Sequence, residues 1–264
     1  MAGKSVKDIV VKVIPANIAV PFVKAHHYSH KVVQNSCLHF GAFLGGVLHG
    51  VMSYGPSMDK RKTIGLVAGT GWNEFLELNR MAFDDALPRN SESRCIGISL
   101  RLIRKNAPHV KWVISFADGC SCGDGTIYRA SNFVLTGITE NKTILQFPTG
   151  EKFAAMTLEA NFDSASVAAL CKKMGLPIKA RTRREWLKLG AEYVNGYQLR
   201  YIYFLDPSAR SRLTVPIIPF SVIDERGAGM YKGERITREE RRNGAQGSEL
   251  NRRISPDSKH PAVG

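Results

Sequence analysis

The sequence lacks the features that mark membrane and secreted proteins. No apolar run approaches the roughly 20 residues that a membrane-spanning helix needs. Residues 1–8 are polar, and the apolar run at 9–14 is too short for the core of a signal peptide. The five cysteines are an odd number without the spacing of a disulfide framework. We therefore expect a cytoplasmic protein that has no membrane partner.

Acidic residues are also scarce. The chain has 23 Asp and Glu residues against 37 Lys and Arg residues, and the resulting net charge of +14 predicts a polyanionic partner. Two basic segments stand out, MDKRK at 58–62 and KARTRR at 179–184. A solvated basic linker is the ordinary alternative for the second segment. We expect phosphate contacts from six side chains: Lys60, Arg61, Lys62, Arg181, Arg183 and Arg184.

Hydrophobic periodicity predicts alternating strands and helices. Apolar runs favour strands at 9–14, 38–44, 47–54, 75–83, 111–117, 133–139 and 199–205. Helical spacing favours helices at 16–26, after residue 90, and at 126–131, 165–174 and 184–194. The sequence thus predicts an α/β domain over residues 1–225, in which a mixed, twisted sheet carries helices on both faces. A basic helical insertion would occupy residues 145–198, and a charged, flexible tail residues 226–264.

The stretch 75–117 organises this predicted core. It reads as strand, loop, helix and strand, and Ile96, Leu100 and Ile103 recur at helical spacing. The loop before the helix, RNSESR at 89–94, combines free N–H groups of a helix start with two guanidinium groups, which favours an anion site. A capped helix on a basic protein explains these residues equally well. Arg80 is a charge within a strand that reads as buried, which indicates a partner or a ligand.

Two further groups of residues suggest chemistry. His26, His27 and His30 share one short segment, where they could act as a base, ligate a metal or contact phosphate. Asp118 follows a strand and precedes a glycine-rich loop, a frequent place for ligand sites in α/β sheets. His27, with His30 or His39, and Asp118 would suit non-haem iron. Surface histidines and an aspartate that starts a turn are the ordinary alternatives.

Several strings of the sequence resemble known families. The order strand, arginine-containing loop, helix, strand and short helix is similar to the acetyl-coenzyme A core of the GNAT acyltransferases, and YRASNF at 128–133 resembles the end of that core. The Gly-x-Gly/Ala loop of that family is absent, and SESR at 91–94 stands in its place. Longer strings resemble the phage Mom DNA-modification family over about residues 11–150: HYSH at 27–30, MDKRK at 58–62, GWNEFLELNRM at 71–81 and SFADG at 115–119.

The resemblance to the Mom family implies an activity and its site residues. Such an enzyme places an acetamide-like (methylcarbamoyl) group on the N6 amine of adenine and so protects phage DNA from host restriction. The implied cofactor is acetyl-coenzyme A, and its implied ligands are Arg80, Ser91, Glu92, Ser93 and Arg94. The implied catalytic residues are His27, Tyr28, Asp118 and Tyr128. By resemblance to GNAT enzymes, Tyr128 would protonate the leaving thiolate of coenzyme A.

The same resemblance sets expectations for partners. The substrate would be double-stranded DNA with the adenine flipped out, in the cytoplasm of the host cell if the chain is phage-encoded. Because acetyl transfer does not supply the nitrogen of the added group, we expect iron as a further cofactor, with His27 and Asp118 as ligands. The oligomeric state is left open, and a homodimer is compatible with the sequence. The competing function is a GNAT N-acetyltransferase that acts on a protein or a small amine.

Overall fold

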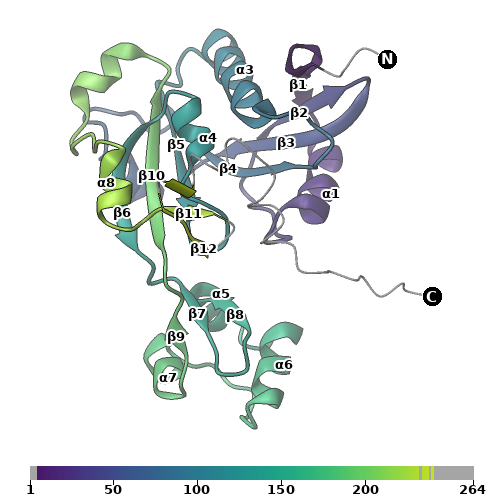
Figure 1. Cartoon of the computed structure of the whole chain (residues 1–264), viewed down its shortest axis with the longest axis vertical. Coiled ribbons are helices and arrows are strands. Elements are labelled where there is room, and N and C mark those ends of the chain that lie inside the picture. Colours follow the sequence, from purple (N-terminus) through teal and green to yellow (C-terminus); the bar gives the residue numbers. More distant parts are fainter. Residues whose placement is uncertain (1–4, 232–233, 238, 241–264) are drawn as a thin grey trace.

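A seven-stranded mixed sheet forms the body of the protein (Figure 1). The computed structural model describes residues 5–231, 234–237 and 239–240. The strands follow the order β1-β2-β3-β4-β5-β10-β6 across the sheet. Their bounds are β1 (Val10–Ile14), β2 (Leu38–Leu44), β3 (Val47–Gly55), β4 (Phe75–Phe83), β5 (Trp112–Asp118), β6 (Val134–Glu140) and β10 (Tyr197–Phe204).

The parallel pair β4 and β5 is short. Every other neighbouring pair in this sheet is antiparallel. The two parallel strands pair only at Phe75–Trp112, Leu76–Val113 and Glu77–Ile114, although both continue beyond these positions. The crossover that a parallel pair requires is made by α3 (Ser91–Asn106). The sheet is therefore divided at its centre, because the ladder between β4 and β5 ends early.

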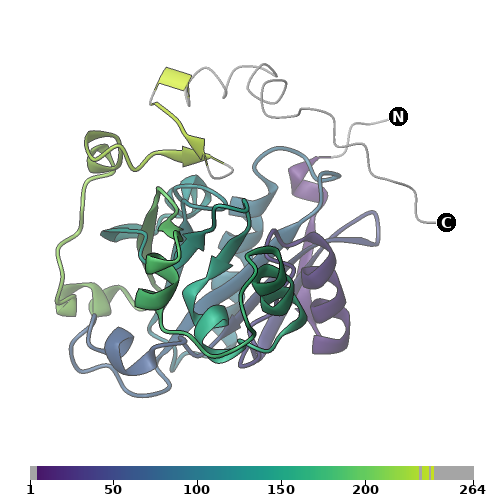
Figure 2. The same ribbon diagram turned by 90° about the horizontal axis from the view of Figure 1, so that it is seen from below.

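Helices cover both faces of the sheet (Figures 1 and 2). On one face, α3 and α4 (Thr126–Ala130) pack through residues such as Ile96 and Tyr128 against Leu78 and its neighbours. On the other face, α1 (Ala16–His26) packs near Ala82 of β4, and the segment around α2 (Lys60–Ile64) covers Ile114 of β5. The predicted fold class, an α/β domain with a mixed sheet and helices on both faces, is confirmed. No helix within the described ranges is long and apolar enough to cross a membrane.

Between β6 and β10 the chain forms a small unit with its own core, which lies below the main sheet in Figure 1. Its sheet has the order β8-β7-β9. Trp186 is fully buried at its centre, with its ring centroid 5.3 Å from that of Phe147. The elements of the unit are β7 (Ile144–Gln146), β8 (Lys152–Ala154), α5 (Ala155–Ala160), α6 (Ala165–Lys173), α7 (Arg183–Lys188) and β9 (Glu192–Tyr193).

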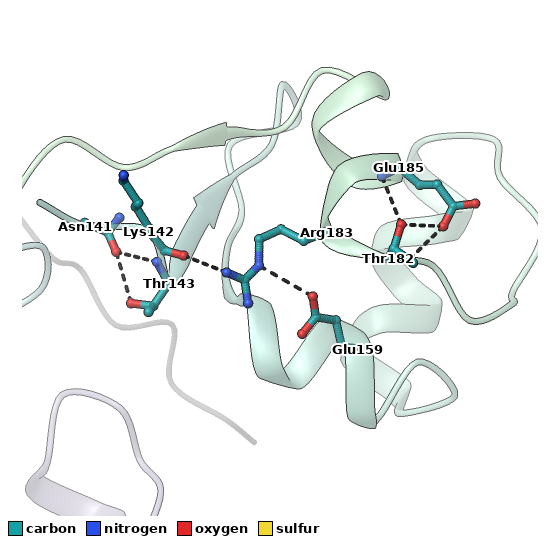
Figure 3. A network of polar contacts seen from close by, with 7 residues as sticks. All are labelled: Asn141, Lys142, Thr143, Glu159, Thr182, Arg183 and Glu185. Atoms are coloured by element: carbon teal, nitrogen blue, oxygen red, sulfur yellow. Dashed lines mark hydrogen bonds and ion pairs between the residues drawn. The ribbon is translucent and has the colours of Figure 1, made fainter. Parts of the chain in front are cut away.

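Asn141 holds the junction between the main sheet and this small unit. Its buried side-chain amide donates to the carbonyl oxygens of Ile144 at 2.9 Å and Val194 at 2.8 Å, one on each connecting segment. Arg183 of α7 pairs with Glu159 of α5, and Figure 3 shows this arginine reaching toward the segment that carries Asn141. The two passages of chain into the unit are thus joined by one amide, which limits their independent movement.

Three segments differ from the predicted elements. The helix predicted for 184–194 ends at Lys188, because Gly190 takes a φ of 90° and β9 follows. The basic segment at 58–62, for which no helix is predicted, enters α2, whose first turn is capped by the side chain of Asp59. Ala228 and Met230 are buried, so the packed body runs beyond residue 226, where the predicted tail begins. Most of that predicted tail lies outside the described residues.

Short elements complete the described structure. They are η1 (Val6–Asp8), η2 (Pro207–Arg212), α8 (Ser221–Glu225), β11 (Met230–Tyr231) and β12 (Glu234–Arg235). The backbone N–H of Asp124 donates to the Met230 carbonyl, so the C-terminal segment is attached to the loop that follows β5. That loop is consequently held from two sides, because Gly119 also donates its N–H to Tyr197 of β10.

Candidate active site

The candidate site lies where β4 and β5 part. Ser115 follows the last paired residue of β5, and its hydroxyl donates to the Leu78 carbonyl at 3.3 Å. Tyr128 of α4 is buried, and its side chain hydrogen-bonds to Ser115. A phenol hydroxyl is thereby placed at the point where the central ladder of the sheet ends.

α1 ends at His26 and delivers the histidine segment to this region. His27 is buried, and its Nδ1 accepts the backbone N–H of Ser29 at 3.1 Å. An Nδ1 that accepts an N–H leaves the proton of the neutral imidazole on Nε2. Burial, followed by the charges of Arg80 and His30, lowers the pKa of His27 to about 4. His27 is therefore neutral at pH 7 and presents an N–H group.

Arg80 supplies a positive charge beside this histidine. Its Nε donates to the Lys31 carbonyl at 3.1 Å, and its Nη1 donates to the Asn79 carbonyl at 2.7 Å. These two hydrogen bonds fix the guanidinium between β4 and the segment that carries His27. The charge of Arg80 lowers the pKa of both His27 and Tyr28, although burial is the larger effect on each.

Asp118 ends β5 and holds the glycine-rich loop that follows. Its Oδ1 accepts the backbone N–H of Cys120 at 3.0 Å, and its carbonyl accepts the N–H of Cys122 at 2.8 Å. After burial, the carboxylate of Asp118 is the next cause that raises the pKa of the Tyr28 hydroxyl and of the Cys122 thiol. Such couplings require close approach, so Tyr28, Asp118 and Cys122 belong to one cluster.

Both tyrosines of the site are held in their protonated form. Burial raises the pKa of Tyr128 to about 12, and the neighbouring Cys122 and Glu77 add to the effect. Burial and Asp118 raise the pKa of Tyr28 in the same direction. Tyr28 retains 49% of its surface, whereas Tyr128 retains 8%. Each phenol can donate a proton or a hydrogen bond, and neither acts as a base near neutral pH.

Two residues of this cluster were missed by sequence reasoning. Glu77 of β4 is within hydrogen-bonding reach of the Ser57 side chain, and burial raises its pKa. The sequence does contain an indication for Glu77, because a carboxylate in a strand that reads as buried is as unusual as the charge of Arg80 in the same strand. Cys122 gave no comparable signal, since a cysteine in a glycine-rich loop has many ordinary roles.

A basic pocket of about 550 Å³ opens beside α3. Its walls include Asn90, Ser93, Arg94, Arg101 and Arg104. Arg94 Nε is buried without a hydrogen-bond partner, which costs free energy unless a ligand accepts from it. The Asn90 side chain makes no capping hydrogen bond, so it does not compete for the N–H groups of the first turn. The pocket is suited to a ligand that carries phosphate groups.

The structure divides the predicted cofactor residues between two places. Ser93 and Arg94 line the basic pocket. Ser91 is buried and its hydroxyl donates to the Pro88 carbonyl, so it is used within the turn. Glu92 raises the pKa of Cys122 and therefore lies toward the cluster of Tyr28, Asp118 and Cys122. Arg80 lies with His27 and is not among the residues that line the pocket.

The predicted phosphate contacts of the small unit need one correction. Arg181 is only 6% exposed, and its Nη2 donates to the Pro177 carbonyl at 2.8 Å. Its guanidinium also lies 4.9 Å from the centre of the Trp186 ring. This guanidinium is thus used inside the unit, which corrects its assignment to a phosphate. Arg183 pairs with Glu159, whereas Arg184 is exposed.

The other predicted basic segment, residues 58–62, leads into α2. The Lys60 ammonium sits 4.4 Å from the centre of the Trp72 ring, and Lys62 pairs with Asp59 on the surface. Arg61 is exposed. This segment therefore carries three basic side chains, of which Lys60 lies against an exposed tryptophan.

The described residues do not assemble the predicted iron triad. No group of three or more His, Cys, Asp and Glu side chains among them could hold a metal ion. His27 Nδ1 is engaged by Ser29, and His39 Nδ1 is hydrogen-bonded to the Ser53 hydroxyl at 2.8 Å. Asp118 is tied to the loop that follows it. The donor set differs from the expected one because its members already have partners within the chain.

Comparison with known proteins identifies a family whose members match most of this chain. The model of the Mom protein family matches residues 8–222. The methylcarbamoylase Mom of Escherichia phage Mu is 34% identical over 217 residues, which cover 82% of this chain and 84% of that protein.

Solved structures give weaker likenesses. The ribosomal-protein-S18-alanine N-acetyltransferase of Escherichia coli has a TM-score of 0.39 and 8% identity, over 75% of this chain and 94% of that one. An N-acetyltransferase of Staphylococcus aureus Mu50 has a TM-score of 0.41 and 9% identity, over 75% and 99% of the two chains. With TM-scores this low, these likenesses give no information about the cofactor or the reaction of this chain.

We expect His27 to stay neutral in the metal-free protein between about pH 5 and pH 8. Its pKa of about 4 lies below the ordinary 6.5, so the unfolded chain binds the proton more readily. The contribution of His27 to the free energy of unfolding is therefore fully present above about pH 6.5. It is lost as the pH falls toward 4, because the unfolded chain then takes up the proton first. Nitrogen NMR of the ring should show one Nε2–H tautomer throughout, and His27→Gln should reduce the pH dependence of unfolding. A His27 resonance that titrates between pH 5 and pH 8 would contradict this assignment.

Proposed function

The chain belongs to the Mom protein family, and on this premise we propose that it is an enzyme that modifies DNA. The acceptor is the N6 amine of adenine in double-stranded DNA, and the product carries an acetamide-like (methylcarbamoyl) group. Acetyl-coenzyme A supplies the two-carbon unit, and a second compound supplies the nitrogen that an acetyl group lacks. A two-electron oxidant takes up the two hydrogens that are lost when the methyl carbon bonds to the amine. Modification in the cytoplasm of the host cell would protect phage DNA from restriction enzymes.

The observation that carries this proposal is the meeting of side chains from four elements at the point where β4 and β5 part. Tyr28 follows α1, Arg80 lies on β4, Asp118 ends β5 and Tyr128 lies on α4. Each of the last three affects the pKa of Tyr28. A titratable group whose pKa is perturbed by burial and by specific charged neighbours is a candidate for a functional site. The cluster therefore supports a site for proton transfer and not an ordinary surface.

The roles we propose follow from the protonation states. The exocyclic amine of adenine is a poor nucleophile, because its lone pair is delocalised into the ring. The carboxylate of Asp118 would accept the proton that the amine loses. Tyr128 would donate a proton to the leaving thiolate, for which its raised pKa of about 12 keeps it ready. Neutral His27 would orient a carbonyl oxygen or a ring nitrogen through its Nε2–H.

The residues of the basic pocket fit coenzyme A. Ser93, Arg94, Arg101 and Arg104 would hold its phosphate groups, and the partnerless Nε of Arg94 supports a bound acceptor there. When bound, the cofactor supplies an acyl group activated as a thioester. Arg80 would act at the reacting end and not on the phosphates, because it is held beside His27.

The described residues fit iron less well. His27 Nδ1 accepts the backbone N–H of Ser29, so Nε2 could bind a metal only if its proton moved to Nδ1, which also lies 2.8 Å from the Ser29 hydroxyl oxygen. Asp118 remains as a single carboxylate. We derive no step of the reaction through a metal, and the nitrogen source stays a separate question of chemistry.

The small unit would hold the DNA. It is inserted next to the catalytic loop, since the Cys120 thiol contacts the Val194 carbonyl and Gly119 donates to Tyr197. Its exposed basic side chains, with the buried Arg181 excluded, are Lys152, Lys172, Lys173, Lys179, Arg184 and Lys188. Cations of this kind bind phosphates without regard to sequence. A duplex held there would present its bases close to Asp118.

The chemical test is mass spectrometry of nucleosides from DNA of cells that express the chain. We expect a new deoxyadenosine derivative whose added mass includes a nitrogen atom. Asp118→Asn and Tyr128→Phe should each reduce its yield by about 100-fold or more, the scale of general acid–base catalysis. The exposed Glu225→Gln variant should match the parent. Unmodified DNA together with an acetylated protein or small amine would overturn the proposal in favour of an ordinary N-acetyltransferase.

The cofactor assignment has its own test. Arg94→Gln should weaken binding of acetyl-coenzyme A by roughly 10- to 150-fold, because a charge-assisted contact is worth about 1.5–3 kcal/mol. Calorimetric titration measures the change. Lys105→Gln, on the same helix but not among the pocket residues, is the matched control and should bind like the parent. Equal affinity in Arg94→Gln and the parent would show that the pocket does not hold the phosphates.

Two sets of variants distinguish DNA binding by the small unit from the stability of that unit. Replacement of Lys179, Arg184 and Lys188 together by alanine should weaken binding to any duplex sequence. The slope of log K against log salt should fall by roughly 0.9 for each phosphate that the variant no longer neutralises. Arg181→Ala should instead lower the unfolding temperature, because it removes the partner of Trp186. The reverse pattern, with a changed salt slope only in Arg181→Ala, would show that Arg181 binds phosphate after all.

A further inference from the structure

Phe116 is an anomaly in the main sheet. It lies on β5, which has neighbours on both sides, and yet 42% of its surface is exposed. Large apolar side chains of interior strands are normally covered by helices or by a second sheet. An uncovered aromatic ring in the middle of a sheet is therefore a candidate contact for a partner.

The exposure of Phe116 follows from where the cover ends. Side chains two residues apart on a strand share a face, so Ile114, Phe116 and Asp118 point to the same side of the sheet. Ile114 is fully buried in the cluster formed with the segment around α2. Phe116 lies one step beyond that cover, and Asp118 one step further. The ring is thus the last residue before the catalytic carboxylate on the same face.

Arg200 lies beside this ring. It is the direct partner of Phe116 in the register of β10 with β5, and such partners have neighbouring side chains. Its Nε donates to the Thr136 hydroxyl at 3.0 Å, and its Nη2 donates to the Thr136 carbonyl at 2.7 Å. A Cβ atom on Gly137 would lie 3.3 Å from its Cζ, so the guanidinium lies over a glycine that leaves space for it. The side chain is therefore held in place.

Phe116, Arg200 and Gly137 form what we call the platform, which crosses β5, β10 and β6. Aromatic rings and guanidinium planes on an exposed sheet are the groups on which proteins stack unpaired bases. The excess of positive charge on the chain favours a nucleic acid over an apolar peptide as the occupant. The position next to Asp118 favours the base that reacts over a distant one.

We propose that the platform is the binding site of the extruded nucleobase. The base stacks on the ring of Phe116, with Arg200 along its edge, and this places its exocyclic amine toward Asp118. This inference rests on the proposed function, since it assigns the acceptor subsite of that reaction. It makes Phe116 a positioning residue, because the ring holds the base and takes no part in proton transfer.

The test uses the full-length chain and does not require turnover. Fluorescence anisotropy compares its affinity for a short oligodeoxyadenylate with that for an abasic strand of the same length. Phe116→Leu keeps an apolar side chain but removes the ring, and it should weaken binding of the oligodeoxyadenylate by about 5- to 150-fold, the scale of one stacked base. Its affinity for the abasic strand should equal that of the parent. Phe116→Tyr should restore the preference for bases, and Phe220→Leu, at another exposed ring, should leave it unchanged.

Two results would overturn the proposal. The first is a Phe116→Leu variant with the parent's preference for bases, and the second is an equal loss of affinity for both strands. Should the variants fail to fold, photo-cross-linking of the parent chain to an oligonucleotide that contains 5-iodouracil decides the matter. The cross-linked peptide should contain Phe116, and cross-links confined to other segments would count against the platform. A platform that binds bases in a chain that leaves DNA unmodified would refute the proposed function alone.

Discussion

The early end of the ladder between β4 and β5 is the constraint on which the rest of the site depends. Had the two strands stayed paired beyond Glu77 and Ile114, their backbone groups would have been satisfied by each other. Because they part, the Leu78 carbonyl accepts from the Ser115 side chain, and Ser115 in turn hydrogen-bonds to Tyr128. A parallel pair tolerates this because its register is held at the other end, where the rings of Phe75 and Trp112 stack at 4.4 Å.

Because the small unit is inserted between β6 and β10, the main sheet also positions this unit. β10 pairs with β5 along its whole length, so whatever β10 carries is placed in register with Asp118. The unit keeps its own core around Trp186, and Asn141 fastens both connecting segments. A basic surface can thus be added next to the site without disturbing the packing of the main sheet. Exposed cations occur on the unit and on α2, and also on α3 of the main body.

Sequence patterns predicted the main sheet well because period-two and helical spacing are imposed by a core that is covered on both faces. They failed where tertiary contacts decide. KARTRR reads as six similar residues, yet Arg181 turns inward onto Trp186 while Arg184 remains exposed. The exposure of Phe116 was equally hidden, since the pattern of β5 predicts burial and only the end of the α2 cover reveals the ring. Likewise, no spacing rule separates Arg80 from Ser93, which the fold sends to different places.

Several residues with shifted pKa values, together with one uncovered aromatic ring, lie near the point where β4 and β5 part. His27 is kept neutral, Glu77 and Tyr128 have raised pKa values, and Phe116 is left uncovered in mid-sheet. Of the titratable groups, only Glu77 carries a cost near neutral pH, because burial raises the pKa of its carboxyl, whereas His27 and Tyr128 are neutral there in the folded and the unfolded chain alike. Tyr128 also contributes to the core, in the same cluster as Ile96. Perturbed titratable groups that gather beside an uncovered aromatic ring are typical of a functional site. Glu77 and Arg80 lie on β4 and Phe116 lies on β5, so these residues flank the point where the two strands part, and the proposed platform and Asp118 meet there.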